Sequence, residues 1–200
     1  MVKKLNPILV QKGLAEKDII IFSPREFQRI FAVSGFAAQK FIHQHARKGF
    51  FNKLKNGLYC LSSAKPHSFV VANKLYAPSY ISLATALSFH GIIPETSYGI
   101  SSVSTKATRD IYSCQKEFTY SKIKKSLFTG YGFYRQNNEK FFMAEPEKAL
   151  LDYLYFLTLN SGKINSRINI TKLNKQKIKK WQKLFNNPKI DKFITELYAG

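Results

Sequence analysis

Acidic residues and cysteine are scarce in this sequence, and long apolar runs are missing. Its 200 residues include 32 Lys and Arg but only 12 Asp and Glu, so the formal net charge is +20 at pH 7. A field of this sign attracts polyanions, and nucleic acid and an anionic membrane are the two obvious partners. The two cysteines, Cys60 and Cys114, belong to no spaced motif, which argues against a disulfide framework and fits a reducing compartment.

No stretch of the sequence is long and apolar enough for a membrane helix. Such a helix needs about 18 consecutive apolar residues, and the richest run, residues 149–159, is interrupted by Asp152. The opening residues 1–7 lack the apolar segment of a signal peptide. We therefore expect a cytoplasmic protein that has no membrane partner.

The acidic residues are also unevenly distributed along the chain. Residues 27–94 contain no Asp or Glu, whereas the same stretch carries the basic residues Arg29, Lys40, Arg47, Lys48, Lys53, Lys55, Lys65 and Lys74. Such a run cannot neutralise itself with local ion pairs. We interpret it as the footprint of a phosphate backbone. A Lys-rich surface that only keeps the protein soluble is the alternative.

One short segment near the N-terminus carries several helix-start signals at once. Ser23 is a preferred N-cap residue, Pro24 suits the first helical position, and Glu26 completes a capping box with Ser23. Phe22 and Phe27 occupy the two positions of a hydrophobic staple. The sequence therefore predicts a helix that begins at Pro24.

A second helix is predicted from Ser34 to about Lys48, and Gly49 ends it. Two short helices joined by so short a turn are typical of a helix-turn-helix. The side of the second helix that we expect to face the core consists of Ala38, Phe41, Ile42 and His45. The opposite side is polar and consists of Gln39, Lys40, His43, Gln44 and Arg47.

This polar side has the chemistry of a DNA recognition helix. Gln pairs bidentately with adenine, Arg and Lys pair with guanine, and His donates or accepts a hydrogen bond. A solvated helix face is the alternative. We favour DNA reading because a helix precedes this face, no acid lies on it, and a basic hairpin follows it. The predicted DNA-binding residues are Ser34, Gln39, Lys40, His43, Gln44, Arg47, Lys48, Lys53, Lys55 and Asn56.

The hairpin is predicted from Asn56 and Gly57, which stand between two apolar-rich runs and tolerate positive φ. Lys53 and Lys55 flank this turn. A hairpin directly after a recognition helix is a wing, and its basic tip would lie near a phosphate or in the minor groove.

Two further elements complete the first domain. Residues 5–13 can form a helix, and residues 19–22 can add a short strand to the hairpin. The order helix, strand, helix, helix, hairpin is that of a winged helix. We therefore assign residues 1–64 to a winged helix-turn-helix DNA-binding domain and place a boundary in the polar connection at residues 62–68.

Residues 68–200 are expected to form a second, α+β domain. We expect a short helix over residues 68–76 and another that is capped by Ser79 and closed by Gly91. β-branched and aromatic residues then alternate with polar ones at residues 98–103, 117–120, 130–134 and 141–143, with a turn at Asn137 and Asn138. This pattern predicts a small, mostly antiparallel sheet.

Helices are predicted for the remainder of the chain. One begins at Pro146, and two more cover residues 172–185 and 190–198. The tail carries a basic surface that consists of Lys175, Lys177, Lys179, Lys180 and Lys183. A second phosphate contact and a solvated helix face are both open interpretations of this surface.

Two segments carry a family resemblance. Residues 78–91, with the sequence PSYISLATALSFHG, and residues 144–155, with the sequence AEPEKALLDYLY, resemble the two halves of a signature. Together with a winged helix that ends in Gly57-Leu58-Tyr59, they resemble the AbiEi-type antitoxins and related transcriptional regulators over roughly residues 20–160.

The resemblance implies a function in an abortive-infection toxin–antitoxin pair. In that family the winged helix binds inverted repeats in double-stranded DNA and represses the shared operon, and the C-terminal domain provides the antitoxin activity. The implied functional partner is a nucleotidyltransferase-like toxin, and the regulator acts as a monomer or dimer on DNA. A stand-alone DNA- or RNA-binding regulator without a toxin is the alternative.

No pattern of catalytic residues stands out. Glu145, Glu147, Lys148 and Asp152 are similar to the acid cluster of a metal-dependent nuclease. Pro146 and the helix start explain the two Glu residues as partners of the helix dipole, and we assign Asp152 to the polar face of that helix. We therefore predict a non-enzymatic protein with no cofactor and no metal. A module that binds RNA or an acidic partner, and a nuclease, are the competing hypotheses.

Overall fold

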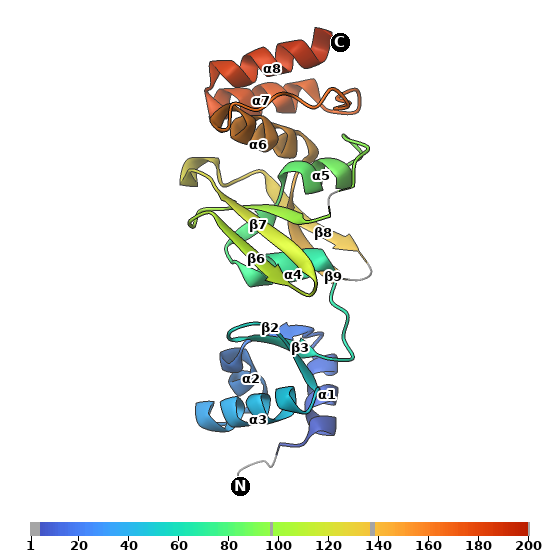
Figure 1. The fold of residues 1–200 in the computed structure, drawn as a ribbon, viewed down its shortest axis with the longest axis vertical. Helices are drawn as coiled ribbons and strands as arrows, with labels where there is room; N and C mark the ends of the chain where they lie inside the picture. The colour runs from blue at the N-terminus through green and yellow to red at the C-terminus, as the bar shows by residue number, and fades with distance from the viewer. Residues whose placement is uncertain (1–4, 97, 137–138, 200) are drawn as a thin grey trace. The chain divides into compact units, whose positions relative to one another are not determined.

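The computed structural model describes residues 5–96, 98–136 and 139–199. The chain divides into two compact units, Met1–His67 and Ser68–Gly200 (Figure 1). The division falls inside the polar connection at residues 62–68. The architecture is mixed α/β, with eight α-helices, a three-stranded sheet and a six-stranded sheet among the described residues. No described helix is long and apolar enough to cross a membrane.

The first unit combines three helices with an antiparallel sheet whose strand order is β1-β3-β2. Its elements are α1 (Pro7–Glu16), β1 (Ile21–Phe22), α2 (Pro24–Phe31), α3 (Gly35–Arg47), β2 (Phe51–Lys55) and β3 (Leu58–Leu61). The order of elements is therefore the predicted one, and helix α1 begins two residues later than expected, at Pro7, because Asn6 caps it.

Helix α2 begins where its capping residues predict. The backbone N–H of Glu26 donates to the hydroxyl of Ser23 at 3.2 Å, and the backbone N–H of Ser23 donates to the Glu26 carboxylate at 2.7 Å. The rings of Phe22 and Phe27 lie 5.5 Å apart, which completes the hydrophobic staple. The predicted start of this helix is confirmed.

The core of the first unit is largely aromatic. Phe22, Phe27 and Phe51 are at most 2% exposed. The ring of Phe27 lies 5.8 Å from that of Phe41 on α3, and the rings of Phe22 and Phe51 meet edge to face at 5.3 Å. Each such ring stabilises the fold by roughly 1.5–3 kcal/mol through burial. This cluster therefore holds α2, α3 and the sheet in one arrangement.

The second unit contains a six-stranded sheet with helices on both faces. Its elements are α4 (Ser68–Leu75), β4 (Ser79–Ile81), α5 (Leu83–Phe89), β5 (Ile100–Ser104), β6 (Arg109–Ser113), β7 (Lys116–Lys122), the 3-10 helix η1 (Lys125–Leu127), β8 (Tyr131–Gln136), β9 (Glu139–Ala144), α6 (Pro146–Leu159), α7 (Lys175–Phe185) and α8 (Pro188–Ala199).

Two tyrosine hydroxyl groups mark the two faces of this sheet. Tyr120 on β7 donates to the backbone carbonyl of Ala72 on α4 at 2.7 Å. Tyr80 on β4 donates to the carboxylate of Asp152 on α6 at 2.9 Å. Helix α4 therefore covers one face of the sheet and α6 covers the other (Figure 1).

The prediction of a small, mostly antiparallel sheet is wrong about its size and incomplete about its topology. The strand order is β6-β7-β5-β4-β9-β8, and the pairs β5–β7 and β4–β9 are parallel. Strand β6 escaped prediction because its residues are mostly exposed at a sheet edge and show no apolar alternation. The turn predicted at Asn137 and Asn138 lies outside the described residues.

The helix predicted to be capped by Ser79 is also wrong at its start. Ser79 begins strand β4, which pairs with β5 and β9, and the helix that follows begins at Leu83 with Ser82 as its N-cap residue. Tyr80 is fully buried by this pairing. Pairing with distant strands outweighed the local helical pattern at Ser79. The sequence did not reveal the strand, because three residues are too few to show an apolar alternation.

Candidate nucleic-acid interface

The polar face of helix α3 is exposed along its whole length. Its exposed residues are Gln39, Lys40, His43, Gln44 and Arg47, all five of which the sequence placed on one side. Ala38 and Ile42 on the opposite side are fully buried, and Phe41 is 8% exposed. The helix therefore has one side fixed in the core and one side available to a partner.

His45 shows how the two sides of α3 are separated. Its ring stacks on Phe41 with 3.9 Å between centroids, and its Nδ1 lies 2.9 Å from the backbone carbonyl of Phe41. His43, two residues earlier, is exposed. The two imidazoles therefore point to different sides of the helix and cannot share a metal ion.

Both ends of α3 are set by residues of the predicted site. The hydroxyl of Ser34 accepts a hydrogen bond of 3.2 Å from the backbone N–H of Ala37 and so caps the helix. Lys48 is the C-cap residue and is exposed, and Gly49 follows with a φ of 76°. Ser34 is therefore engaged in capping, whereas the ammonium group of Lys48 lies at the surface.

The hairpin β2–β3 presents basic residues at its turn. Lys53, Lys55 and Asn56 are exposed, and the register of the two strands shifts between Lys53 and Lys55. Gly57 has a φ of 75°, and Asn56 is not among the residues with positive φ. A single left-handed residue is therefore enough for this turn.

One exposed aromatic side chain on α3 escaped the sequence analysis. Phe36, in the first turn, is 77% exposed. It lies four residues before Lys40 and seven before His43, so it belongs to the same face as these polar residues. The helical periodicity of the sequence could have predicted this exposure, because Phe36 falls outside the apolar stripe formed by Ala38 and Phe41. An exposed Phe among basic and amide groups can contact a thymine methyl group.

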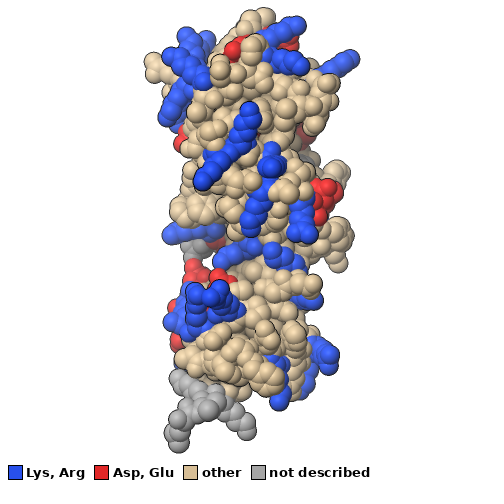
Figure 2. Space-filling view, turned by 90° about the vertical axis from the view of Figure 1, so that its left-hand side faces the viewer, with Lys and Arg blue, Asp and Glu red and all other residues tan. Residues whose placement is uncertain are grey.

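The charges of the first unit are segregated by element. Its acidic residues are Glu16 at the end of α1, Asp18 in the following turn and Glu26 in α2. Helix α3 and the hairpin carry none. Figure 2 shows Lys and Arg side chains spread over the drawn face of the protein, with Asp and Glu confined to a few places. Helix α3 and the hairpin therefore carry only basic groups among their charged residues.

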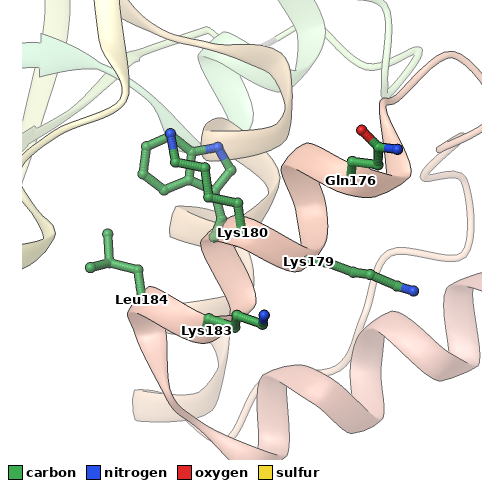
Figure 3. A pocket seen from close by; sticks show the side chains of 6 residues that line it. Gln176, Lys179, Lys180, Lys183 and Leu184 are labelled. Atoms are coloured by element: carbon green, nitrogen blue, oxygen red, sulfur yellow. The ribbon is translucent and has the colours of Figure 1, made fainter.

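A second basic surface lies on helix α7 of the other unit. A groove of about 630 Å³ is lined by Gln176, Lys179, Lys180, Trp181, Lys183 and Leu184. Figure 3 shows Lys179 and Lys183 extending from the helix, with Gln176 and Leu184 toward its two ends. The indole N–H of Trp181 is buried and has no hydrogen-bond partner among the described residues.

The structure contradicts the prediction for one residue of the acid cluster near the start of α6. Asp152, assigned to the polar face of the helix, is fully buried, as is Lys148. The two side chains form an ion pair, and Asp152 also accepts hydrogen bonds from Tyr80 at 2.9 Å and Ser82 at 2.8 Å. Glu147 is 5% exposed and accepts a hydrogen bond from the backbone of Asn174.

Burial dominates the titration of this buried cluster. It raises the pKa of Asp152 and lowers the pKa of Lys148, while their mutual attraction opposes both shifts. The pKa of Tyr80 is raised well above its usual range by burial and by the Asp152 charge. Because Lys148 and Asp152 are closed off from solvent, the cluster joins structural elements and offers no surface to a substrate.

The described residues contain no group of three or more His, Cys, Asp or Glu side chains that could hold a metal ion. Comparison of the chain with models of known protein families and with curated proteins finds no match. The functional assignment therefore rests on the residues and their geometry.

Proposed function

We propose that the first unit is a winged helix-turn-helix that binds double-stranded DNA, and that the protein is a transcriptional regulator. The observation that carries the proposal is the division of α3. Its apolar side is locked into an aromatic core, while five amide, imidazole and basic side chains on the other side are exposed. This is the arrangement that a recognition helix needs to enter the major groove.

The exposed side chains of α3 supply different contacts in this proposal, and His43 can donate or accept a hydrogen bond. Arg47 and Lys40 supply donors for guanine, and Gln39 and Gln44 supply paired donors and acceptors for adenine. Phe36 adds an apolar contact to thymine methyl groups. Base reading therefore falls to α3, whose side chains carry both hydrogen-bonding and apolar groups.

The hairpin is proposed as the wing that holds the domain on the duplex. Lys53 and Lys55 contact phosphates or enter the minor groove, and Asn56 lies at the tip between them and Gly57. Contacts of this kind position the protein without reading sequence. The absence of acidic residues from α3 and the hairpin supports the proposal, because a carboxylate there would repel the backbone.

We further propose that the regulator is the antitoxin of a toxin–antitoxin pair of the abortive-infection type, with a nucleotidyltransferase-like toxin as its functional partner. The support is the resemblance of residues 78–91 and 144–155 to the AbiEi-type signature. These two segments contact each other directly, through the hydrogen bonds of Tyr80 and Ser82 to Asp152. A DNA- or RNA-binding regulator that acts without a toxin is the second candidate.

A selection experiment tests the DNA-binding proposal. The purified full-length chain is incubated with a pool of random duplexes, bound DNA is recovered over several rounds, and the enriched sequences are compared. The proposal predicts one enriched motif, arranged as an inverted repeat, and stronger binding to that duplex than to single-stranded RNA of equal length. Preference for single-stranded RNA, or no enrichment, would contradict it.

The antitoxin proposal needs a separate test. The neighbouring gene is expressed alone and together with this protein, and growth of the host is followed. The proposal predicts that a neighbouring nucleotidyltransferase arrests growth and that co-expression restores it. Failure of rescue by a chain that still binds its operator would leave the stand-alone regulator.

A further inference from the structure

A hollow in the second unit combines aromatic walls with basic and hydroxyl groups. It encloses about 460 Å³ between α4, the segment that leads into β4, and strands β8 and β9. Small-molecule sites usually measure roughly 300–1,000 Å³, so this hollow is of adequate size. Its aromatic lining residues are Phe128, Tyr131, Phe133, Phe141 and Phe142.

The rings form a continuous series from the interior to the surface. The ring of Tyr131 stacks on the buried ring of Tyr80 at 4.4 Å and lies 5.2 Å from that of Phe128. Phe142 meets Tyr131 edge to face at 5.8 Å and lies 4.2 Å from Phe133. Phe133 itself is 69% exposed. A flat aromatic ring bound beside Phe133 would extend this series by offset or edge contacts and would cover apolar surface that the fold leaves in water.

The uncharged polar side chains that line the hollow add no contact for a ligand. Ser79 is 6% exposed, and its hydroxyl oxygen has no hydrogen-bond partner among the described residues. This oxygen is closed off from solvent, so a ligand in the hollow does not reach it. Asn73 is not free for a ligand either, because its side chain is already paired at both ends with the backbone of Phe142.

The charge of the hollow has one sign. Lys74 and Lys140 line it, and none of its described lining residues is Asp or Glu. Lys140 lies on β9 next to Phe141 and is exposed, so its ammonium group can reach a ligand at the mouth of the hollow. Positive charge beside an aromatic wall is complementary to an aromatic ring that bears an anionic group.

We propose that this hollow binds a small, flat aromatic molecule that carries a carboxylate or a comparable anionic group. The ring lies against Phe133 and Phe142, and the anionic group pairs with Lys140. The site is independent of the proposed DNA-binding surface, because it is formed by the second unit alone.

The test uses 1-naphthoate as the probe and the full-length chain, labelled with ¹⁵N and followed by NMR. The proposal predicts saturable shifts of backbone signals from β8, β9 and α4. Trp181 is the only tryptophan of the sequence and lines the groove on α7, so its indole N–H signal reports binding at that other site. This signal is expected to stay unchanged.

Two ligand analogues separate the contributions of ring and charge. The neutral 1-naphthalenemethanol keeps the ring and loses the charge, whereas cyclohexanecarboxylate keeps the charge and loses the flat ring. Each analogue is expected to bind at least about fivefold more weakly than 1-naphthoate, because each loses one favourable contact.

Three variants complete the experiment. Phe133→Ala removes a ring that is mostly exposed and is expected to weaken 1-naphthoate about fivefold without unfolding the protein. Lys140→Gln is expected to abolish the preference for 1-naphthoate over its neutral analogue. Lys179→Gln, on α7, is the matched control and is expected to change nothing. Shifts centred on Trp181, equal affinities for all three compounds, or the absence of saturation would overturn the proposal.

Discussion

The hydroxyl of Tyr80 donates a 2.9 Å hydrogen bond to the carboxylate of Asp152, and this contact joins strand β4 to helix α6 inside the second unit. Asp152 also pairs with Lys148 one helical turn away and accepts a hydrogen bond from Ser82. Strand β4 and helix α6 are thus held together by buried polar groups.

Breaking the buried ion pair should be costly. Asp152→Asn leaves the Lys148 ammonium group buried without a counter-charge, and we expect a loss of about 3–5 kcal/mol in the free energy of unfolding. The double variant Lys148→Met, Asp152→Asn removes that stranded charge, so it should lose less than the sum of the two single variants. Urea denaturation followed by Trp181 fluorescence measures the free energy of unfolding of the two single variants and of the double variant. Additive losses would show that the pair carries no coupling.

Gly130 should not tolerate a side chain. Its φ is 74°, and a Cβ atom placed on it would lie 2.5 Å from Cη2 of Trp181 and 2.9 Å from Cγ of Lys148. We expect Gly130→Ala to lower the free energy of unfolding by about 2–4 kcal/mol through backbone strain and overpacking. Gly132→Ala is the matched control, because a Cβ atom there meets nothing within 4 Å. Similar effects of both substitutions in a denaturant titration would refute this explanation.

The stability of the second unit should fall in mild acid. Burial lowers the pKa of His90, against a smaller opposing effect of the hydrogen bond with the Ala144 carbonyl at 2.9 Å and of the Glu147 charge. The unfolded chain, with a His pKa of about 6.5, therefore binds protons before the folded chain does. The contribution of His90 to the free energy of unfolding is therefore complete above the unfolded-state pKa of about 6.5, and it declines as the pH falls below that value.

The measurement for His90 is the free energy of unfolding from urea titrations at pH about 7.5 and about 5.5, which bracket the unfolded-state pKa. His90→Gln, which keeps a donor for the carbonyl, should show a flatter dependence on pH than the native chain. An identical slope in both proteins would assign the effect to other groups.

The hairpin lysines should control the salt dependence of DNA binding. If Lys53 and Lys55 each neutralise one phosphate, either alanine variant reduces the slope of log affinity against log salt by about 0.9. Both should weaken binding to every duplex by a similar factor. Lys12→Ala on α1 is the control, since Lys12 is exposed but lies near Glu16. An unchanged slope for both hairpin variants would remove the wing from the interface.

Local signals made much of the first unit predictable. The capping box of Ser23 and Glu26, the staple of Phe22 and Phe27, and the apolar stripe through Ala38 involve residues within one or two helical turns. Such interactions depend on neighbours in the sequence and can be read there. The exposed polar side of α3 followed from the same periodicity.

The second unit was less predictable because its decisive contacts are distant. Ser79 resembled a helix cap, but its segment pairs with strands β5 and β9. Lys148 and Asp152 have the spacing of a solvated surface pair, but both are buried, and Asp152 accepts a hydrogen bond from Tyr80, 72 positions away. The parallel pairing of β5 with β7 likewise leaves no local signal.

The most direct test of the whole account compares α3 variants on two duplexes. Gln44→Ala, Arg47→Ala and the control Gln11→Ala, an exposed residue of α1, are titrated against the selected duplex and a scrambled duplex of equal length and salt. Base reading by α3 predicts that the two α3 variants lose about 1–3 kcal/mol of binding free energy on the selected duplex and little on the scrambled one, while the control loses nothing. Equal losses on both duplexes, or none, would contradict base reading by α3.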